Sequence, residues 1–328
     1  MVAGRAPHPW VAASLFTVGP VGYAQSNSPD DLTALALRLA ASSAVTGYEQ
    51  DLVDSLIHLL PGARRDRAGN ALLLRPGGSA RRLVVCPLDE RGYVVGHLRP
   101  DGYLTLRRSP GRAASPLLDQ QLEGQRVTIQ GERGPVPGVV AVRSIHLTRG
   151  RDPPTEAPFT VDSARLDVGA ESPADLDRLG VQVLAPVTLT KRPHIYGTGL
   201  LAAPVAGRRA ACAALVLAVR QSSLRAKLLP PVTVAFVVEQ ELSRRGVYTV
   251  ANVNGPFDQT LIVDGSPGQL GSIQRKTGVD SSSQAKSMGR VLEWSLPVRY
   301  AGTPVETVSL ADADSLRAAL FRWIGGDE

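Results

Sequence analysis

The sequence predicts an α/β fold in which a mostly parallel β-sheet is flanked by helices and carries an inserted small β-barrel domain. Helical and strand-like patterns alternate near both ends of the chain, which is typical of a parallel sheet with helices on both faces. Residues 83–86 and 232–238 are almost entirely apolar, as strands buried on both faces are. From about residue 92 to 189 the pattern changes to short strands and turns, which indicates a barrel or sandwich.

The helices and strands of the main domain are expected on either side of that change. Leucines at helical spacing (32, 35 and 39) predict a first helix that Ser28 caps and that begins at Pro29, and a second helix over 50–60. Strands are expected next at 71–74 and 83–86. After the insertion we expect strands at 232–238, 260–263 and 294–296, and helices at 207–221, 244–251 and 311–323. Because both parts show the same alternation, residues 25–91 and 189–328 are predicted to form one domain around one sheet.

The inserted domain is predicted to span residues 92–188. Its first two strands flank Arg99-Pro100-Asp101-Gly102, in which Pro and Gly stand where a hairpin turn favours them. Further strand-like runs occur at 126–130, 139–142 and 181–187.

Residues 1–24 have the order of a secretory signal peptide. Arg5 lies in a short polar lead, residues 10–18 are apolar, and the small residues Gly22 and Ala24 follow helix breakers. The apolar part is too short to cross a bilayer, and nothing later in the chain is apolar enough to do so. We therefore expect an exported protein, periplasmic or extracellular. The alternative is an unstructured tail on a cytoplasmic protein.

Composition argues against nucleic acid as a partner. The net charge is +6, but the arginines are scattered, and aromatic residues make up 5% of the chain, too few to interleave with a basic run as single-strand binders require. The two cysteines, Cys86 and Cys212, each lie in an apolar run. They are predicted to be buried, unpaired thiols, with a bridge between them as the open alternative.

Short motifs follow one another along the chain from about Asp31 to its end. In order they are Thr46-Gly47-Tyr48-Glu49, Asp66-Arg67-Ala68-Gly69-Asn70, Leu88-Asp89-Glu90-Arg91-Gly92, Gly138-Val139-Val140 with His146 after it, Leu166-Asp167-Val168-Gly169-Ala170, Glu241-Leu242-Ser243-Arg244-Arg245-Gly246, and finally Thr277-Gly278-Val279-Asp280, Leu296-Pro297-Val298-Arg299-Tyr300 and Pro304-Val305-Glu306. This succession resembles the tetrahedral aminopeptidases, the glutamyl aminopeptidase (endoglucanase-M-like) family of dinuclear-metal peptidases. The resemblance implies an aminopeptidase-like body with an inserted barrel, and a homo-oligomer.

The resemblance also implies a site of two zinc or cobalt ions with five protein ligands and a glutamate base. Most of those positions carry other residues here. The two histidines would stand at Pro87 and Gly302, the bridging aspartate at Ala206, and the base at Gln240, an amide that accepts no proton at neutral pH. The implied ligands that remain are Glu241 and Asp264.

The absence of ligand-type residues from two stretches of the sequence independently indicates that these metal ligands are missing. No Asp, Glu or His occurs between His194 and Glu239, so no bridging carboxylate can come from that stretch. No histidine follows His194, and the histidine nearest to Pro87 is His97, within the inserted domain. We therefore expect no metal cofactor and no catalytic residue.

The sequence favours a non-catalytic, aminopeptidase-like protein that binds a protein or peptide partner or assembles. The alternative is an active metal-dependent hydrolase with an altered site, such as one Mg²⁺ or Ca²⁺ held by Asp89, Glu241 and Asp264.

If Asp89, Glu241 and Asp264 converge, with Glu90 beside them, their like charges need compensation by protonation of one carboxylate, by water in the cleft or by a basic neighbour. The candidate basic neighbours are Arg208, Arg209 and Lys276.

Overall fold

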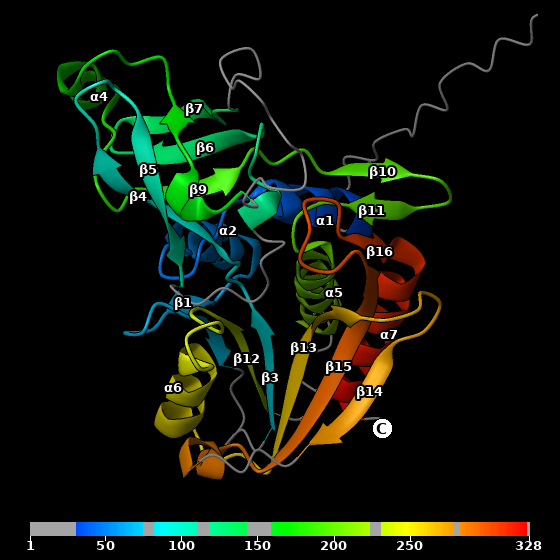
Figure 1. Cartoon of the computed structure of the whole chain (residues 1–328). Coiled ribbons are helices and arrows are strands. Elements are labelled where there is room, and N and C mark those ends of the chain that lie inside the picture. The colour runs from blue at the N-terminus through cyan, green and yellow to red at the C-terminus, as the bar shows by residue number, and fades with distance from the viewer. Residues whose placement is uncertain are drawn as a thin grey trace, which may run out of the picture.

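The computed structural model describes residues 31–74, 82–110, 119–142, 159–223, 231–278 and 283–326 (Figure 1). The predicted signal segment, residues 1–24, lies outside these ranges, as do His146, Val279 and Asp280 of the motifs. Within the described residues, no helix combines the length and the apolar character that crossing a membrane requires.

The main domain is built on a ten-stranded sheet in the order β1-β2-β12-β3-β13-β15-β16-β11-β10, with β14 paired to β15. Its strands are β1 (Arg64–Arg65), β2 (Ala71–Leu74), β3 (Arg82–Pro87), β10 (His194–Tyr196), β11 (Leu200–Ala202), β12 (Val232–Val237), β13 (Gln259–Pro267), β14 (Gln274–Gly278), β15 (Arg290–Arg299) and β16 (Thr307–Ser309). The four central strands, β12, β3, β13 and β15, are parallel, and the outer pairs are antiparallel. The carboxyl ends of the central strands therefore meet at one edge, where α/β proteins place their sites.

Helices cover both faces of this sheet. They are α1 (Leu32–Ala41), α2 (Gln50–Leu59), α5 (Ala206–Ser223), α6 (Arg245–Asn254) and α7 (Leu310–Gly325). Val84 and Cys86 of β3 pack with α1, α2, α5 and α7, whereas Leu83 and Val85 face α6, on the opposite side (Figure 1). The strand is buried on both faces, which explains its continuous apolar sequence.

The inserted domain is a closed barrel in the order β4-β5-β8-β7-β6-β9, at the top of Figure 1. Its strands are β4 (Gly92–Leu98), β5 (Leu104–Ser109), β6 (Arg126–Gly131), β7 (Gly134–Val140), β8 (Leu166–Asp167) and β9 (Pro186–Leu189). The barrel has its own apolar core, so it is packed rather than hollow. The fold class predicted from the sequence is thus confirmed.

Several elements differ from the sequence prediction. The run 181–187 is not one strand, because only Pro186–Leu189 pairs with β4 and β6. The helix α4 (Pro173–Leu179), which precedes this run, was not predicted. The strands β10, β11 and β14 were also not predicted. β10 and β14 are mostly exposed, so they lack the apolar pattern that marks a buried strand, and β11 is apolar but only three residues long.

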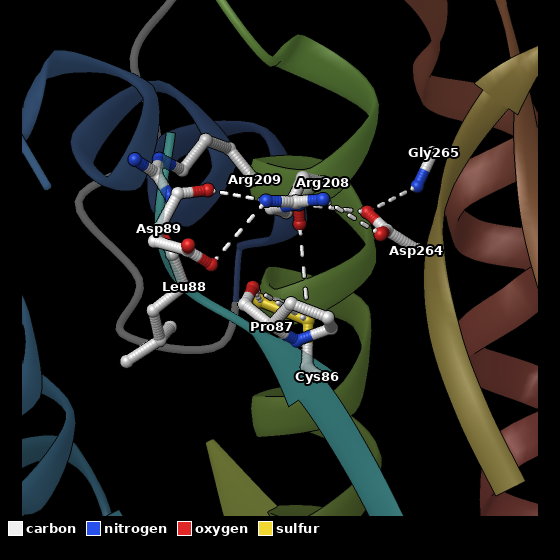
Figure 2. The surroundings of a disulfide bond; sticks show 9 residues. Cys86, Pro87, Leu88, Asp89, Arg208, Arg209, Asp264 and Gly265 are labelled. Atoms are coloured by element: carbon white, nitrogen blue, oxygen red, sulfur yellow. Dashed lines mark hydrogen bonds and ion pairs between the residues drawn. A yellow bond between two sulfur atoms is a disulfide. The ribbon is translucent and has the colours of Figure 1, made fainter. Parts of the chain in front are cut away.

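The prediction of two unpaired thiols is wrong. Cys86, the residue before the end of β3, forms a disulfide with Cys212 in α5, 126 residues further along the chain (Figure 2). Both residues are fully buried. The bond ties the strand end to the first turns of α5.

The start of α5 approaches the sheet closely because two glycines face each other there. A Cβ atom on Gly207 would fall 2.4 Å from Cγ1 of Val298 and 2.9 Å from Cα of Gly265. A side chain on Gly207 or Gly265 would therefore push the helix away from β13. Because neither glycine has a side chain, Arg208, which follows Gly207, lies directly against the carboxylate of Asp264, which precedes Gly265.

Candidate functional site

The candidate site is a cavity of about 550 Å³ where the barrel meets the carboxyl edge of the sheet. Barrel residues such as Tyr93 and Leu122 form one side. The start of α5, the end of β13 and the loop from 301 to 306 form the other, with Arg208, Asp264 and Glu241 among the lining residues. This is the place to which the sequence motifs pointed.

Arg208 lines this cavity and lies between Asp89 and Asp264 (Figure 2). Its Nε and Nη2 donate to the two carboxylate oxygens of Asp264, at 2.9 Å each. Nη2 also lies 3.4 Å from Oε1 of Glu241, and Nη1 lies 3.5 Å from Oδ1 of Asp89 and donates to the Asp89 backbone carbonyl. One guanidinium, 13% exposed, therefore joins three acidic side chains.

Asp89 is fully buried and accepts bonds from several directions. The backbone N–H groups of Gln240 and Glu241 donate to its two oxygens at 3.0 and 2.9 Å, and the Thr46 hydroxyl donates at 3.0 Å. Its position follows from the topology: β3 and β12 are parallel neighbours, so the residues just after each strand meet.

The charges in the cluster shift one another's titration. Burial alone would disfavour a charged Arg208, but Asp264, Asp89 and Glu241 outweigh it and raise the pKa of the guanidinium. Burial also raises the pKa of Asp89, even though Arg208 and the backbone donor Glu241 act in the opposite direction. The site thus favours the charged form of Arg208 and disfavours the ionised form of Asp89.

The other two basic candidates lie elsewhere. Arg209 is fully buried, donates to the carbonyl of Leu88 and lies 3.6 Å from Oε1 of Glu90. The Glu90 carboxylate is also paired with Lys191. Burial opposes the ionisation of Glu90, but Lys191 and Arg209 outweigh it and lower the pKa of this carboxyl. Lys276 lies on exposed β14, where its backbone pairs with Glu293 of β15. Of the three, only Arg208 bonds to the converging carboxylates.

The implied ligand positions Pro87, Ala206 and Gly302 offer no side-chain donor to a metal. Pro87 ends β3, and Ala206, the first residue of α5, is fully buried. Gly302 lies in a turn at φ +71°, which side-chain-bearing residues rarely adopt. Oε1 of Gln240 is buried and has no hydrogen-bond partner among the described residues.

The donor set does not fit a dinuclear metal centre. Both surviving ligand carboxylates, Glu241 and Asp264, are bonded to Arg208. Across the described ranges, no group of three His, Cys, Asp or Glu side chains has a metal-binding arrangement.

Three charged residues of the site were missed by sequence reasoning. The Glu306 carboxylate accepts the backbone N–H groups of Gly207 and Gly302, at 3.0 Å each, and so ties the start of α5 to the neighbouring loop. Lys191 pairs with Glu90, and Arg91 donates to Glu241 at 2.8 Å. Glu306 and Arg91 lie within the motifs of the sequence analysis, but no role was assigned to them there. Lys191 lies in no motif, and it reaches the cavity because the chain leaves the barrel at this point.

Glu49 is a further buried acid beside this cluster. It is 2% exposed, and its Oε1 accepts the backbone N–H groups of Gly47 and Glu239 at 3.1 and 3.0 Å. Burial raises the pKa of Glu49 to about 7; the two backbone bonds oppose this shift, and the charge of Asp89 adds to it.

Comparison with known proteins shows the family of this chain. The model of the M42 glutamyl aminopeptidase family matches residues 69–276. SgcX of Escherichia coli strain K12, which is named as a candidate aminopeptidase, is 30% identical over 237 residues, which are 70% of this chain and 61% of SgcX. The lysyl aminopeptidase of Pyrococcus furiosus is 30% identical over 155 residues, which are 45% of this chain and 43% of that protein. The match to each of these relatives thus spans less than two thirds of its length.

Solved structures show the same fold at low identity. The TET1 peptidase of Pyrococcus horikoshii, described as assembling into a tetrahedron or a large octahedral shell, superposes with a TM-score of 0.80 at 19% identity, over 90% of this chain and 99% of that one. An aminopeptidase from the archaeon Desulfurococcus kamchatkensis superposes with a TM-score of 0.75 at 17% identity, over 90% and 95% of the two chains.

We expect Glu49→Gln to stabilise the protein in a pH-dependent way. Below the ordinary pKa of 4.5 the carboxyl is protonated in both states, but between 4.5 and about 7 the unfolded chain ionises first. Native stability attributable to this group is therefore lost as pH rises to about 7, up to roughly 3 kcal/mol. Urea unfolding of both proteins at pH 5 and pH 8 measures this. Exposed Glu123→Gln is the control, and a stability difference that does not grow with pH would contradict the account.

We expect Arg208→Met to lower the free energy of unfolding by about 3–5 kcal/mol, because three acidic groups then lose their shared cation in a buried site. Arg91→Met is the matched control: Arg91 bonds to the same Glu241, but its side chain is 40% exposed. Its loss should cost no more than about 1 kcal/mol. Equal effects of the two substitutions in denaturant titrations would show that Arg208 has no special role.

Proposed function

Because the chain belongs to the M42 glutamyl aminopeptidase family, we propose that it is a non-catalytic member that uses the aminopeptidase fold to bind a protein or peptide or to assemble. The observation that carries this proposal is the guanidinium of Arg208 among Asp264, Glu241 and Asp89. It supplies the positive charge that these carboxylates need, and both oxygens of Asp264 are bonded to it.

Arg208 cannot take over the chemistry of a metal ion. A guanidinium stays protonated and donates hydrogen bonds, but it offers no open coordination position at which water could be ionised. At the position of the implied base, Gln240 cannot accept a proton. The carboxylates that line this cavity are hydrogen-bonded on both oxygens, which favours binding over water activation.

The second candidate is a metal-dependent aminopeptidase or other hydrolase with an altered site. It is favoured by the convergence of Asp89, Glu241 and Asp264 around one point. A cation such as Mg²⁺ or Ca²⁺ would suit these oxygen ligands, but Arg208 would first have to leave.

We expect the purified protein to hold no stoichiometric zinc or cobalt and to release no amino acid from leucine or glutamate amides. Elemental analysis and a substrate panel, each with added Zn²⁺, Co²⁺, Mn²⁺ or Mg²⁺, provide the measurement. Bound metal together with hydrolysis that a chelator abolishes would replace the first candidate with the second.

We further propose that the chain forms a homo-oligomer, since the TET1 peptidase with the same fold assembles into closed shells and the barrel domain is retained. Light scattering at micromolar concentration should give at least twice the mass of one chain. A single-chain mass over the whole concentration range would refute this.

We also propose that the protein is exported, periplasmic or extracellular. The buried disulfide between Cys86 and Cys212 supports this, because such bonds persist mainly in oxidising compartments. Cell fractionation should place the chain in the periplasm or medium with no free thiol after denaturation. A cytoplasmic chain that reacts with two equivalents of a thiol reagent would contradict both the export and the disulfide.

A further inference from the structure

Each charged side chain that lines the cavity has a partner: Glu90, Glu241 and Asp264 are paired with bases of the lining, and Glu306 accepts two backbone N–H groups. The lining acids are Glu90, Glu241, Asp264 and Glu306, and the lining bases are Arg91, Lys191 and Arg208. Glu241 divides its two oxygens between Arg208 and Arg91, while Glu90 accepts from Lys191.

The carboxylate oxygens are also satisfied one by one. Asp264 accepts Arg208 on both oxygens, and Oδ1 takes the Gly265 N–H as well, at 2.8 Å. Both oxygens of Glu306 accept backbone N–H groups, as described above. On Glu90, Oε1 accepts the Ala44 N–H at 2.9 Å, and Oε2 is paired with Lys191. Each of the four lining carboxylates thus has a donor on both oxygens.

The rest of the described lining is largely apolar. Tyr93, Leu122 and Leu189 contribute from the barrel, and Pro204, Val205, Pro267 and Pro304 contribute from the main domain. A cavity of about 550 Å³ lies within the usual ~300–1,000 Å³ of ligand sites and can hold a few residues of a peptide.

From this pairing we infer that the cavity binds an uncharged, mostly apolar peptide segment, internal or blocked at its ends, and disfavours a free α-amino group. A charged terminus entering here would lose hydration, and every charged side chain that it meets in the described lining already has an ionic or backbone hydrogen-bond partner. The apolar walls match a neutral segment, whose transfer from water they favour. This inference rests on the proposed binding function and names the class of its ligand.

Three versions of one tripeptide test the inference with the full-length protein. Titration calorimetry compares N-acetyl-Leu-Ala-Leu-amide, Leu-Ala-Leu-amide with a free amino group, and N-acetyl-Leu-Ala-Leu with a free carboxylate. The fully blocked peptide should bind at least tenfold more tightly than either charged form. No saturable binding of the blocked peptide, or equal or tighter binding of a charged one, would overturn the inference.

Matched variants locate the site. Ala301 lines the cavity, and Val305 lies on the same loop outside the lining and is 52% exposed. Ala301→Trp should weaken the blocked peptide at least tenfold, whereas Val305→Trp should leave its affinity within twofold. The opposite pattern would place any binding elsewhere and refute the inference.

A charge variant tests the pairing itself. Glu241→Gln removes the carboxylate shared by Arg91 and Arg208, so the free-carboxylate peptide should gain at least fivefold in affinity; an unchanged affinity would count against the pairing.

Mass spectrometry of the free-amine peptide after incubation separates the proposed non-catalytic function from the proposed ligand class. Released leucine would refute the non-catalytic function, whereas the order of affinities alone decides the ligand class.

Discussion

The bonds from Arg208 to Asp264, Glu241 and Asp89 are the interaction on which the rest of this site depends. The parallel order of β12, β3 and β13 brings these acids to one edge of the sheet, whatever occupies the space between them. Like charges at such distances in a partly buried cavity require a cation. A forked guanidinium bonds to both oxygens of one carboxylate and reaches two more, which a lysine ammonium would do less well.

Two further features hold Arg208 in place. The facing glycines Gly207 and Gly265 let α5 approach β13, and the Glu306 carboxylate accepts the backbone N–H of Gly207 at that approach. One turn further along α5, the disulfide fixes the helix to the end of β3. The strand end and the helix start, which the family resemblance assigns to metal ligation, are thus joined here by a covalent bond and an ion-pair cluster.

Much of this arrangement could be predicted from the sequence. The alternation of helices and strands specified the sheet and the insertion, because burial imposes a periodicity that local residues carry. The convergence of Asp89, Glu241 and Asp264 called for compensation, and of the three basic candidates expected to provide it Arg208 does so. The disulfide, Glu49 and the Lys191–Glu90 pair could not be derived, because each depends on contacts between distant segments. The edge strand β10 and helix α4 carried too weak a pattern.

The central claim is that a guanidinium stands where the family resemblance places metal ions. Anomalous diffraction from crystals soaked in zinc tests it most directly. The account predicts density for Arg208 bonded to both oxygens of Asp264 and no anomalous peak in the cavity. An anomalous peak coordinated by Asp264 and Glu241, with the Arg208 side chain turned away, would contradict it.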